Sequence, residues 1–163
     1  MKQFLDRLSY LFHRPRYFGK KVLAVVTGGG MFKDIYAYLR NVTKAWGCDF
    51  VTGVGVPHLK GLTPGFRARV LRDLDRGVRA FYDALMQGKP RRPGTGDLMW
   101  FAMWKNAALA YRNPPDLKYW EEKGWLSAPY YYPVSTNPLV LGAIGLASKL
   151  VRSFMRKMYL ESQ

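Results

Sequence analysis

The sequence predicts an α/β fold with parallel strands for residues 1–88, and three features indicate it. Residues 22–27 are apolar at every position before the final threonine, which is typical of a strand buried on both faces of a parallel sheet. A second strand is predicted at 48–57, where the glycines of CDFVTGVGVP indicate a bend or a close approach. The segments around the two strands have helical spacing, and such alternation favours a sheet with helices on both faces.

Three helices are predicted in this part of the chain. Residues 1–13 carry apolar side chains at helical spacing, and the basic connector HRPRYFGKK ends that helix. The second helix follows the glycines of the first strand, and the third covers 64–88, with Pro64 in its first turn and Gly88 as its stop. The expected packing faces are Ile35, Leu39, Val42 and Trp46 in the second helix and Phe66, Val70, Leu74, Val78, Phe81 and Leu85 in the third.

The rest of the chain has a different character. Residues 89–97, KPRRPGTGD, are a linker by composition, and residues 98–163 are rich in tryptophan, tyrosine and methionine. We predict a helix near 98–111, a short helix started by the Pro-Pro pair at 114, an extended YYYP segment and a last helix from Pro138. The C-terminal part is therefore predicted to be a helical, aromatic-rich extension.

The chain carries an excess of positive charge. It has 26 Lys or Arg against 11 Asp or Glu, a formal net charge of +15, which favours an anionic partner such as nucleic acid, a phosphate-bearing cofactor or acidic lipid. Its 48% hydrophobic composition is sufficient for a globular core. The single cysteine, Cys48, excludes an intrachain disulfide and fits a reducing compartment. The sequence shows no signal peptide and no apolar run long enough to cross a membrane, so we expect a cytoplasmic protein.

The residues TGGGM at 27–31 are the clearest candidate for a binding site. Glycines between a strand and a helix permit positive φ and bring a ligand close to backbone N–H groups at the positive end of a helix, which suits a phosphate or an electron-rich ring. A tight connection without a ligand is the alternative. Gly28 and Gly30 supply GxG, but the third glycine of a dinucleotide fingerprint would fall at Lys33, and no P-loop spacing occurs.

Metal and nucleophilic chemistry have little support in the sequence. His13, His58 and Cys48 lie on different predicted elements without ligand spacing, so no metal site is expected. No GxSxG or other triad context surrounds any serine. The sequence therefore assigns no catalytic residue.

The last predicted helix, 138–160, offers a second kind of surface. An apolar stripe with basic residues on another face is compatible with an anionic membrane surface. We favour packing on the protein itself, because core-facing stripes are far commoner, and keep peripheral membrane contact as the alternative. The connector RPRYFGKK interleaves basic and aromatic residues, but we interpret it as a solvated basic face and do not expect nucleic acid as a partner. In the last predicted helix, the apolar stripe consists of Val140, Ile144, Ala147, Val151, Phe154 and Met158, and the basic face consists of Lys149, Arg152 and Arg156.

Several segments, taken in order, resemble the later part of the flavodoxin-like NAD(P)H-dependent FMN reductases. They are MKQFLDR at 1–7, GKKVLAVVTGGG at 19–30, YLRNVTKAWGCDFVTGVGVP at 38–57 and LRDLDRGVRAFYDAL at 71–85, and KYWEEKGWL at 118–126 followed by YYYP is similar to an extension of some of these oxidoreductases. The resemblance covers most of the chain. It implies a flavodoxin-like three-layer parallel sheet, incomplete and limited to its C-terminal part in residues 1–88, with an α-helical C-terminal extension.

The resemblance also implies a cofactor and its site. In this family FMN binds beyond the carboxyl ends of the strands and takes hydride from NAD(P)H. Residues 22–26 match the fourth strand of the family and 50–56 the fifth. Nothing in this chain matches the first three strands or the phosphate loop, so the chain is expected to hold only part of the site. The loop beside the flavin ring corresponds to Thr27, Gly28, Gly29, Gly30 and the neighbouring Met31.

The missing strands predict a partner for the chain. Without them one edge of the strand at 22–27 exposes backbone groups beside apolar side chains, so we expect a second copy or a complementing chain to cover it. The partners implied are thus FMN, NAD(P)H and such a chain. Two alternatives to a flavin-dependent oxidoreductase stay open: a non-catalytic basic module that binds anionic membrane or nucleic acid, and an inactive remnant of the reductase.

Overall fold

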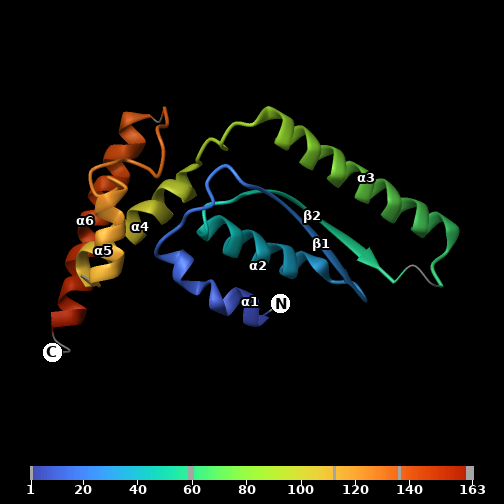
Figure 1. The fold of residues 1–163 in the computed structure, drawn as a ribbon, viewed down its shortest axis with the longest axis horizontal. Helices are drawn as coiled ribbons and strands as arrows, with labels where there is room; N and C mark the ends of the chain where they lie inside the picture. Colours follow the sequence, from blue (N-terminus) through green and yellow to red (C-terminus); the bar gives the residue numbers. More distant parts are fainter. Residues whose placement is uncertain (1, 59–60, 112, 136, 161–163) are drawn as a thin grey trace. The chain divides into compact units, whose positions relative to one another are not determined.

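The computed structural model describes residues 2–58, 61–111, 113–135 and 137–160, with the side chains of 111 and 155–160 left out of the description. The chain divides into two compact units, Met1–Arg91 and Arg92–Gln163. This division falls within the segment 89–97 that the sequence predicts to be a linker. Each unit is described by itself below, and Figure 1 labels the elements of both.

The first unit is a mixed α/β structure with a two-stranded parallel sheet, which confirms the predicted α/β class. The segment predicted as one helix over 1–13 is a short α-helix followed by a turn of 3-10 helix, and the remaining boundaries lie close to those predicted. The elements are α1 (Lys2–Arg7), η1 (Ser9–Phe12), β1 (Lys21–Gly28), α2 (Phe32–Ala45), β2 (Asp49–Pro57) and α3 (Pro64–Gln87).

Helices cover the two faces of this sheet. A Cβ added at Gly53 of β2 would lie 2.7 Å from the Tyr36 ring of α2, whereas a Cβ at Gly77 of α3 would overlap Val54. Successive residues of a strand point to opposite faces, so α2 packs on the Gly53 face and α3 on the Val54 face. Figure 1 shows the two helices on opposite sides of the strands.

The glycines of β2 allow an unusually close approach of α2. A Cβ at Gly55 would overlap the Phe32 ring, just as one at Gly53 would meet Tyr36, and the two rings are stacked with centroids 6.3 Å apart. The predicted close approach at these glycines is therefore confirmed. Aromatic rings of α2 lie where side chains of β2 would otherwise stand.

The prediction that the first strand is buried on both faces is wrong. Ala24 and Val26 are buried, but Val25 is 54% exposed and Thr27 is also exposed. The long helix differs from its prediction too, because Phe66, Val78 and Leu85 are about half exposed. α3 packs mainly on β2 and less closely on β1, so the Val25 and Thr27 side chains of β1 and one flank of α3 stay exposed. In the described part of the chain, the sheet of two strands about 4.8 Å apart has no further strand or second helix to cover them on this face.

The core of the first unit lies mainly between α2 and the N-terminal segment. Leu11 is fully buried and packs with Val42 and Trp46. The backbone N–H of Tyr17 donates to the carbonyl of Trp46 at 3.0 Å, which holds the connector against the end of α2. The predicted inner face of α2 is correct at Val42 and Trp46 and wrong at Ile35, which is 40% exposed, because α2 contacts the sheet through its aromatic residues instead.

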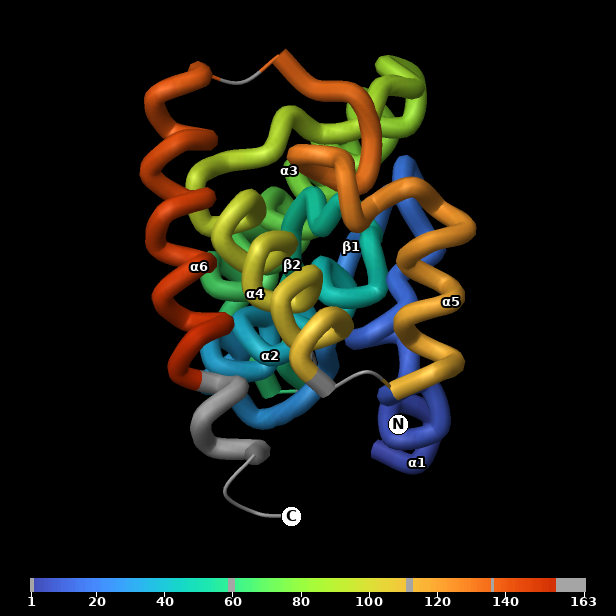
Figure 2. Tube along the Cα trace, turned by 90° about the vertical axis from the view of Figure 1, so that its left-hand side faces the viewer, coloured from blue at the N-terminus to red at the C-terminus, as the bar shows by residue number. Residues whose placement is uncertain are grey.

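The second unit is helical. Its first helix begins three residues before the predicted start, because the Gly94 N–H donates to the Asp97 carboxylate at 2.8 Å in half of a capping box. Figure 2 shows the last helix running alongside the first of this unit. The helices are α4 (Thr95–Tyr111), α5 (Pro114–Glu122) and α6 (Pro138–Leu160).

An aromatic cluster forms the core of the second unit. Phe101 and Trp120 are almost fully buried with ring centroids 5.5 Å apart, and Tyr131 meets Phe101 edge to face at 4.7 Å. The Trp125 indole N–H donates to the carbonyl of Tyr131 at 3.0 Å and fixes the YYYP segment on this cluster. These rings are therefore engaged in packing within their own unit.

Candidate functional site

The five predicted site residues, 27–31, form the connection between β1 and α2. Thr27 and Gly28 are the last residues of β1, and α2 begins at Phe32. Gly28 is paired with Pro57 in the parallel register, so the loop lies at the carboxyl end of both strands (Figure 1). In α/β sheets this is the edge at which ligands bind.

The backbone of this loop is accessible. A Cβ added at Gly29 or Gly30 would have no neighbour within 4 Å, and Met31 is 89% exposed. Gly30 has φ +132° and Met31 φ 56°, and among the described residues Met31 alone has a positive φ without being glycine. A non-glycine residue in the left-handed region is uncommon, and such residues occur often at ligand-binding turns. The backbone strain at Met31 therefore supports this loop as a candidate binding site.

The first turn of α2 sets the electrostatics of the loop. Met31 is the N-cap of the helix, and its side chain accepts no hydrogen bond from the helix. The first backbone N–H groups of a helix have no intrahelical partner and carry the positive end of its dipole. Asp34 lies in the same turn and provides a negative charge. The N-terminus is therefore better suited to a neutral, electron-rich group than to a second anion.

No protein-family model, curated protein or solved structure matches this chain.

An open cleft begins beside the loop and follows the outer edge of β2. Its volume is about 680 Å³, and Phe32 and Lys33 of α2 line its end next to the loop. Gly53 and Gly55 line it from β2, and Arg76 of α3 lines the opposite side together with Asp73, with which it forms an ion pair at 3.5 Å. The cleft therefore combines an aromatic wall with charged side chains of both signs next to the glycine loop.

His58 and Cys48, which the sequence offers as candidate ligands or nucleophiles, do not form a reactive group at the loop. His58 is exposed just after β2, and the two residues that follow it lie outside the described part of the chain. Burial, reinforced by the charge of Asp49, raises the pKa of the Cys48 thiol to about 11, so the thiol is protonated at neutral pH and is a poor nucleophile. Within the described residues no group of three or more His, Cys, Asp or Glu side chains could hold a metal ion.

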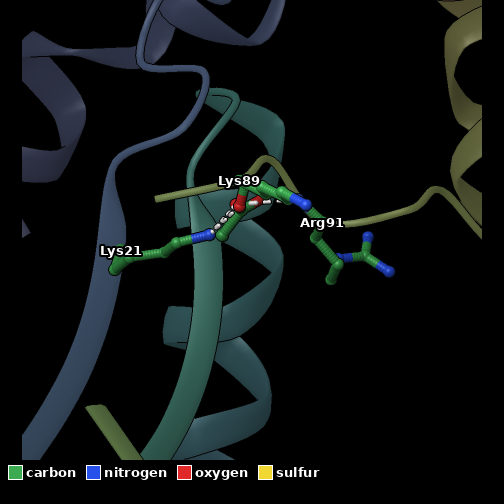
Figure 3. Close-up of polar contacts among 4 residues, drawn as sticks. Lys21, Lys89 and Arg91 are labelled. Carbon is green, nitrogen blue, oxygen red and sulfur yellow. Dashed lines mark hydrogen bonds and ion pairs between the residues drawn. The ribbon is translucent and has the colours of Figure 1, made fainter. Parts of the chain in front are cut away.

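A buried polar network at the opposite end of the strands was not predicted. Lys21 Nζ lies 2.7 Å from Asp49 Oδ2 and donates to the Lys89 carbonyl at 2.6 Å, and the Arg91 N–H donates to the same carboxylate at 3.0 Å (Figure 3). Both charged side chains are at most 10% exposed. The network anchors the segment after α3 to the start of both strands, so its role is structural. A lysine and an aspartate at the first positions of two parallel strands were the signal that could have revealed it.

The apolar stripe predicted for the last helix is only partly buried. Val140 and Ile144 are half-buried, whereas Val151 and Phe154 are exposed, and the predicted Met158 and Arg156 side chains lie outside the description. A different stripe, formed by Leu139, Leu146, Leu150 and Phe154, is between 65% and 81% exposed. In the described part of the chain, no helix is both long and apolar enough to cross a membrane.

Proposed function

We propose that residues 1–88 are the flavin-binding part of an NAD(P)H-dependent FMN oxidoreductase with a flavodoxin-like fold. The observation that carries the proposal is the accessible glycine loop at the carboxyl end of the first of two parallel strands. The resemblance of the sequence to the FMN reductases gives this loop a ligand, the isoalloxazine ring. The basic charge of the chain, +15, favours a cofactor that carries phosphate.

The residues of the loop fit the edge of a flat, electron-rich ring. Gly29 and Gly30 place no side chain between the backbone and a ligand, and their N–H groups are donors for ring oxygen and nitrogen atoms. The exposed Met31 side chain supplies a flexible apolar contact for the face of the ring. Phe32 and Tyr36 provide the aromatic wall of the adjoining cleft.

In this proposal the chain positions the flavin ring and supplies no acid-base catalyst. Bound FMN accepts hydride from a nicotinamide and passes electrons to an acceptor. The loop holds the ring edge and leaves one face open, and the cleft along β2 provides the room for a second planar ligand. This role requires no catalytic side chain of the chain itself, in agreement with a loop that holds Thr27 as its one polar side chain.

The proposal also includes a strand from another chain that pairs with the open edge of β1. β1 pairs with β2 on one side, and within the described residues no strand pairs with its other side. Val25 exposes an apolar side chain beside this edge. We propose that a second copy or a complementing chain covers it, because an uncovered edge of this kind pairs readily with other chains. Sedimentation velocity of the chain tests this, with Val25→Lys expected to reduce self-association.

FMN titration of the purified chain tests the flavin proposal. Binding is expected to quench flavin fluorescence, and NADPH added without oxygen is expected to bleach the 450 nm absorption of the bound flavin. Gly29→Leu places a bulky side chain on the loop without a positive-φ penalty, so we expect at least tenfold weaker binding. The matched control is Gly65→Leu, at an exposed glycine of α3 that also has no neighbour within 4 Å. Equal FMN binding by the two variants, or no saturable quenching by the parent chain, would contradict the proposal.

One observation favours a second candidate function, the binding of anionic membrane surfaces by α6. Leu146 and Leu150 present an exposed apolar stripe, and Lys149 lies exposed next to it. An apolar face flanked by basic residues is the pattern of an interfacial helix. Co-sedimentation with phosphatidylserine vesicles is expected to fall when Leu146 and Leu150 are both replaced by Gln and to stay unchanged in Leu71→Gln, at an exposed leucine of α3.

A further inference from the structure

The second unit contains a cleft that none of the functions above uses. It has a volume of about 390 Å³ and lies between α4, α6 and the segment 126–129. Phe101 and Leu109 of α4 and Leu141 and Ile144 of α6 give it apolar walls. Clefts of this size lined mainly by apolar side chains are typical of small-molecule sites.

Three cations gather on this cleft. Lys105 comes from α4, and Lys149 and Arg152 come from α6, where their i, i+3 spacing places them on neighbouring positions of one side of the helix. No Asp or Glu lines the cleft, and among the described residues none of the three forms an ion pair with a carboxylate. Lys105 and Arg152 are partly buried, whereas Lys149 is exposed. Positive charges in a partly desolvated position without an anion are unfavourable, and an anionic ligand would relieve this at Lys105 and Arg152.

Lys105 is the cation of the cleft whose contacts within the unit are defined. Its Nζ donates to the carbonyl of Ala128 at 3.1 Å and lies 5.9 Å from the centre of the Phe101 ring. Burial, and then the nearby charge of Arg152, lowers the pKa of Lys105. An ammonium group has three donors, so Lys105 retains donors for a ligand after its bond to Ala128.

The α6 wall of the cleft is open at a glycine that lies one turn before Lys149. Gly145 lines the cleft from α6, and a Cβ added there would have no neighbour within 4 Å. A position that faces α4 would normally meet packed side chains, because protein interiors are close-packed. The space at Gly145 therefore belongs to the cleft and extends along its apolar walls.

We propose that this cleft binds a single-chain amphiphile with a carboxylate head, such as a fatty acid. The carboxylate would bind Arg152 and Lys105, with Lys149 adding positive charge at the mouth, and the alkyl chain would lie between Phe101, Leu141 and the open wall at Gly145. The planar guanidinium of an arginine matches a carboxylate through two parallel hydrogen bonds. This site lies wholly within the second unit and does not depend on the glycine loop or on FMN.

Isothermal titration of the full chain with dodecanoate, kept below its micelle-forming concentration, tests the proposal. One saturable site is expected. Dodecanol and dodecyltrimethylammonium are expected to bind at least tenfold more weakly, because they lack the anionic head. Arg152→Gln is expected to weaken dodecanoate binding about tenfold, as the loss of a charge-assisted hydrogen bond does. Gly145→Phe is expected to abolish it by filling the cleft.

Matched variants and mapping make the test specific. Lys123→Gln removes one positive charge from α5's end outside the cleft and is expected to leave binding unchanged. Circular dichroism of each variant checks that its helices are retained. Amide chemical shifts are expected to change at Gly145 and Ser148. The absence of a saturable site, equal binding of dodecanol, equal loss in Lys123→Gln, or shifts confined to the exposed Leu146 stripe would overturn the proposal.

Discussion

The buried pair Lys21–Asp49 gives the sharpest test of what holds the first unit together. Its atoms are 2.7 Å apart, and the side chains are 8% and 10% exposed. Lys21→Met leaves the Asp49 carboxylate in this buried site without its cation, and Asp49→Leu leaves the ammonium group without its anion. Removing one partner of a buried pair costs about 3 kcal/mol or more of unfolding free energy, whereas replacing both by apolar residues is often close to neutral.

Hydrogen exchange of peptides from β1 and β2 measures this effect within the first unit. We expect each single variant to lower the free energy of opening of these strands by about 3 kcal/mol, and Lys21→Met/Asp49→Leu to recover most of that loss. Recovery should be incomplete, because the Lys89 carbonyl and the Arg91 N–H also lose their side-chain partners. Exchange in α5 serves as an internal control. Single variants that change exchange by less than about 0.5 kcal/mol, the usual effect of a surface substitution, or a double variant equal to the sum of the singles, would refute this reasoning.

Three further predictions concern the same unit. Gly55→Leu overlaps the Phe32 ring and is expected to lower the unfolding free energy by about 1–3 kcal/mol in urea titrations. Leu11→Ala removes a fully buried side chain and is expected to cost about 2–5 kcal/mol, whereas Leu71→Ala, at a half-exposed leucine, should change stability by less than about 0.5 kcal/mol. The rate at which iodoacetamide alkylates Cys48, the single thiol of the chain, should rise with a midpoint near pH 11 instead of 9. Because the folded state keeps this proton more tightly, that contribution to stability is full below pH 9 and is lost as the pH rises towards 11.

The order of elements was predictable because its signals are local. The apolar run of the first strand, Pro64 at the start of the long helix and Gly88 at its end are readable from a few neighbouring residues, and the structure places α3 at Pro64–Gln87 with Gly88 as its cap. Burial was less predictable, because it depends on the width of the sheet. The apolar residues Val25, Val78 and Leu85 suit a core, but a sheet of two strands leaves them exposed.

The candidate sites differ in the same way. The glycine loop was visible in the sequence because its residues are consecutive. The Lys21–Asp49 network joins residues 28 positions apart, and the cleft of the second unit joins Lys105 of α4 to Arg152 of α6. Such groupings depend on how helices and strands pack together, which neither spacing nor composition reports. Asn106, whose side chain donates to the carbonyl of Ala102 at 2.8 Å, is a further polar residue of that cleft without a sequence signal.

The aromatic cluster of the second unit also determines the intrinsic tryptophan fluorescence of the protein. Four of the five tryptophans follow residue 91, and Trp120 and Trp125 stand edge to face with ring centroids 5.4 Å apart. Indole emission of the whole chain is therefore dominated by residues 92–163, while Trp46 alone reports on the first unit. A melting curve followed by fluorescence would describe mainly the helical unit. Replacing Trp46 by Phe would make that signal exclusive to it and leave the sheet to be followed by backbone methods.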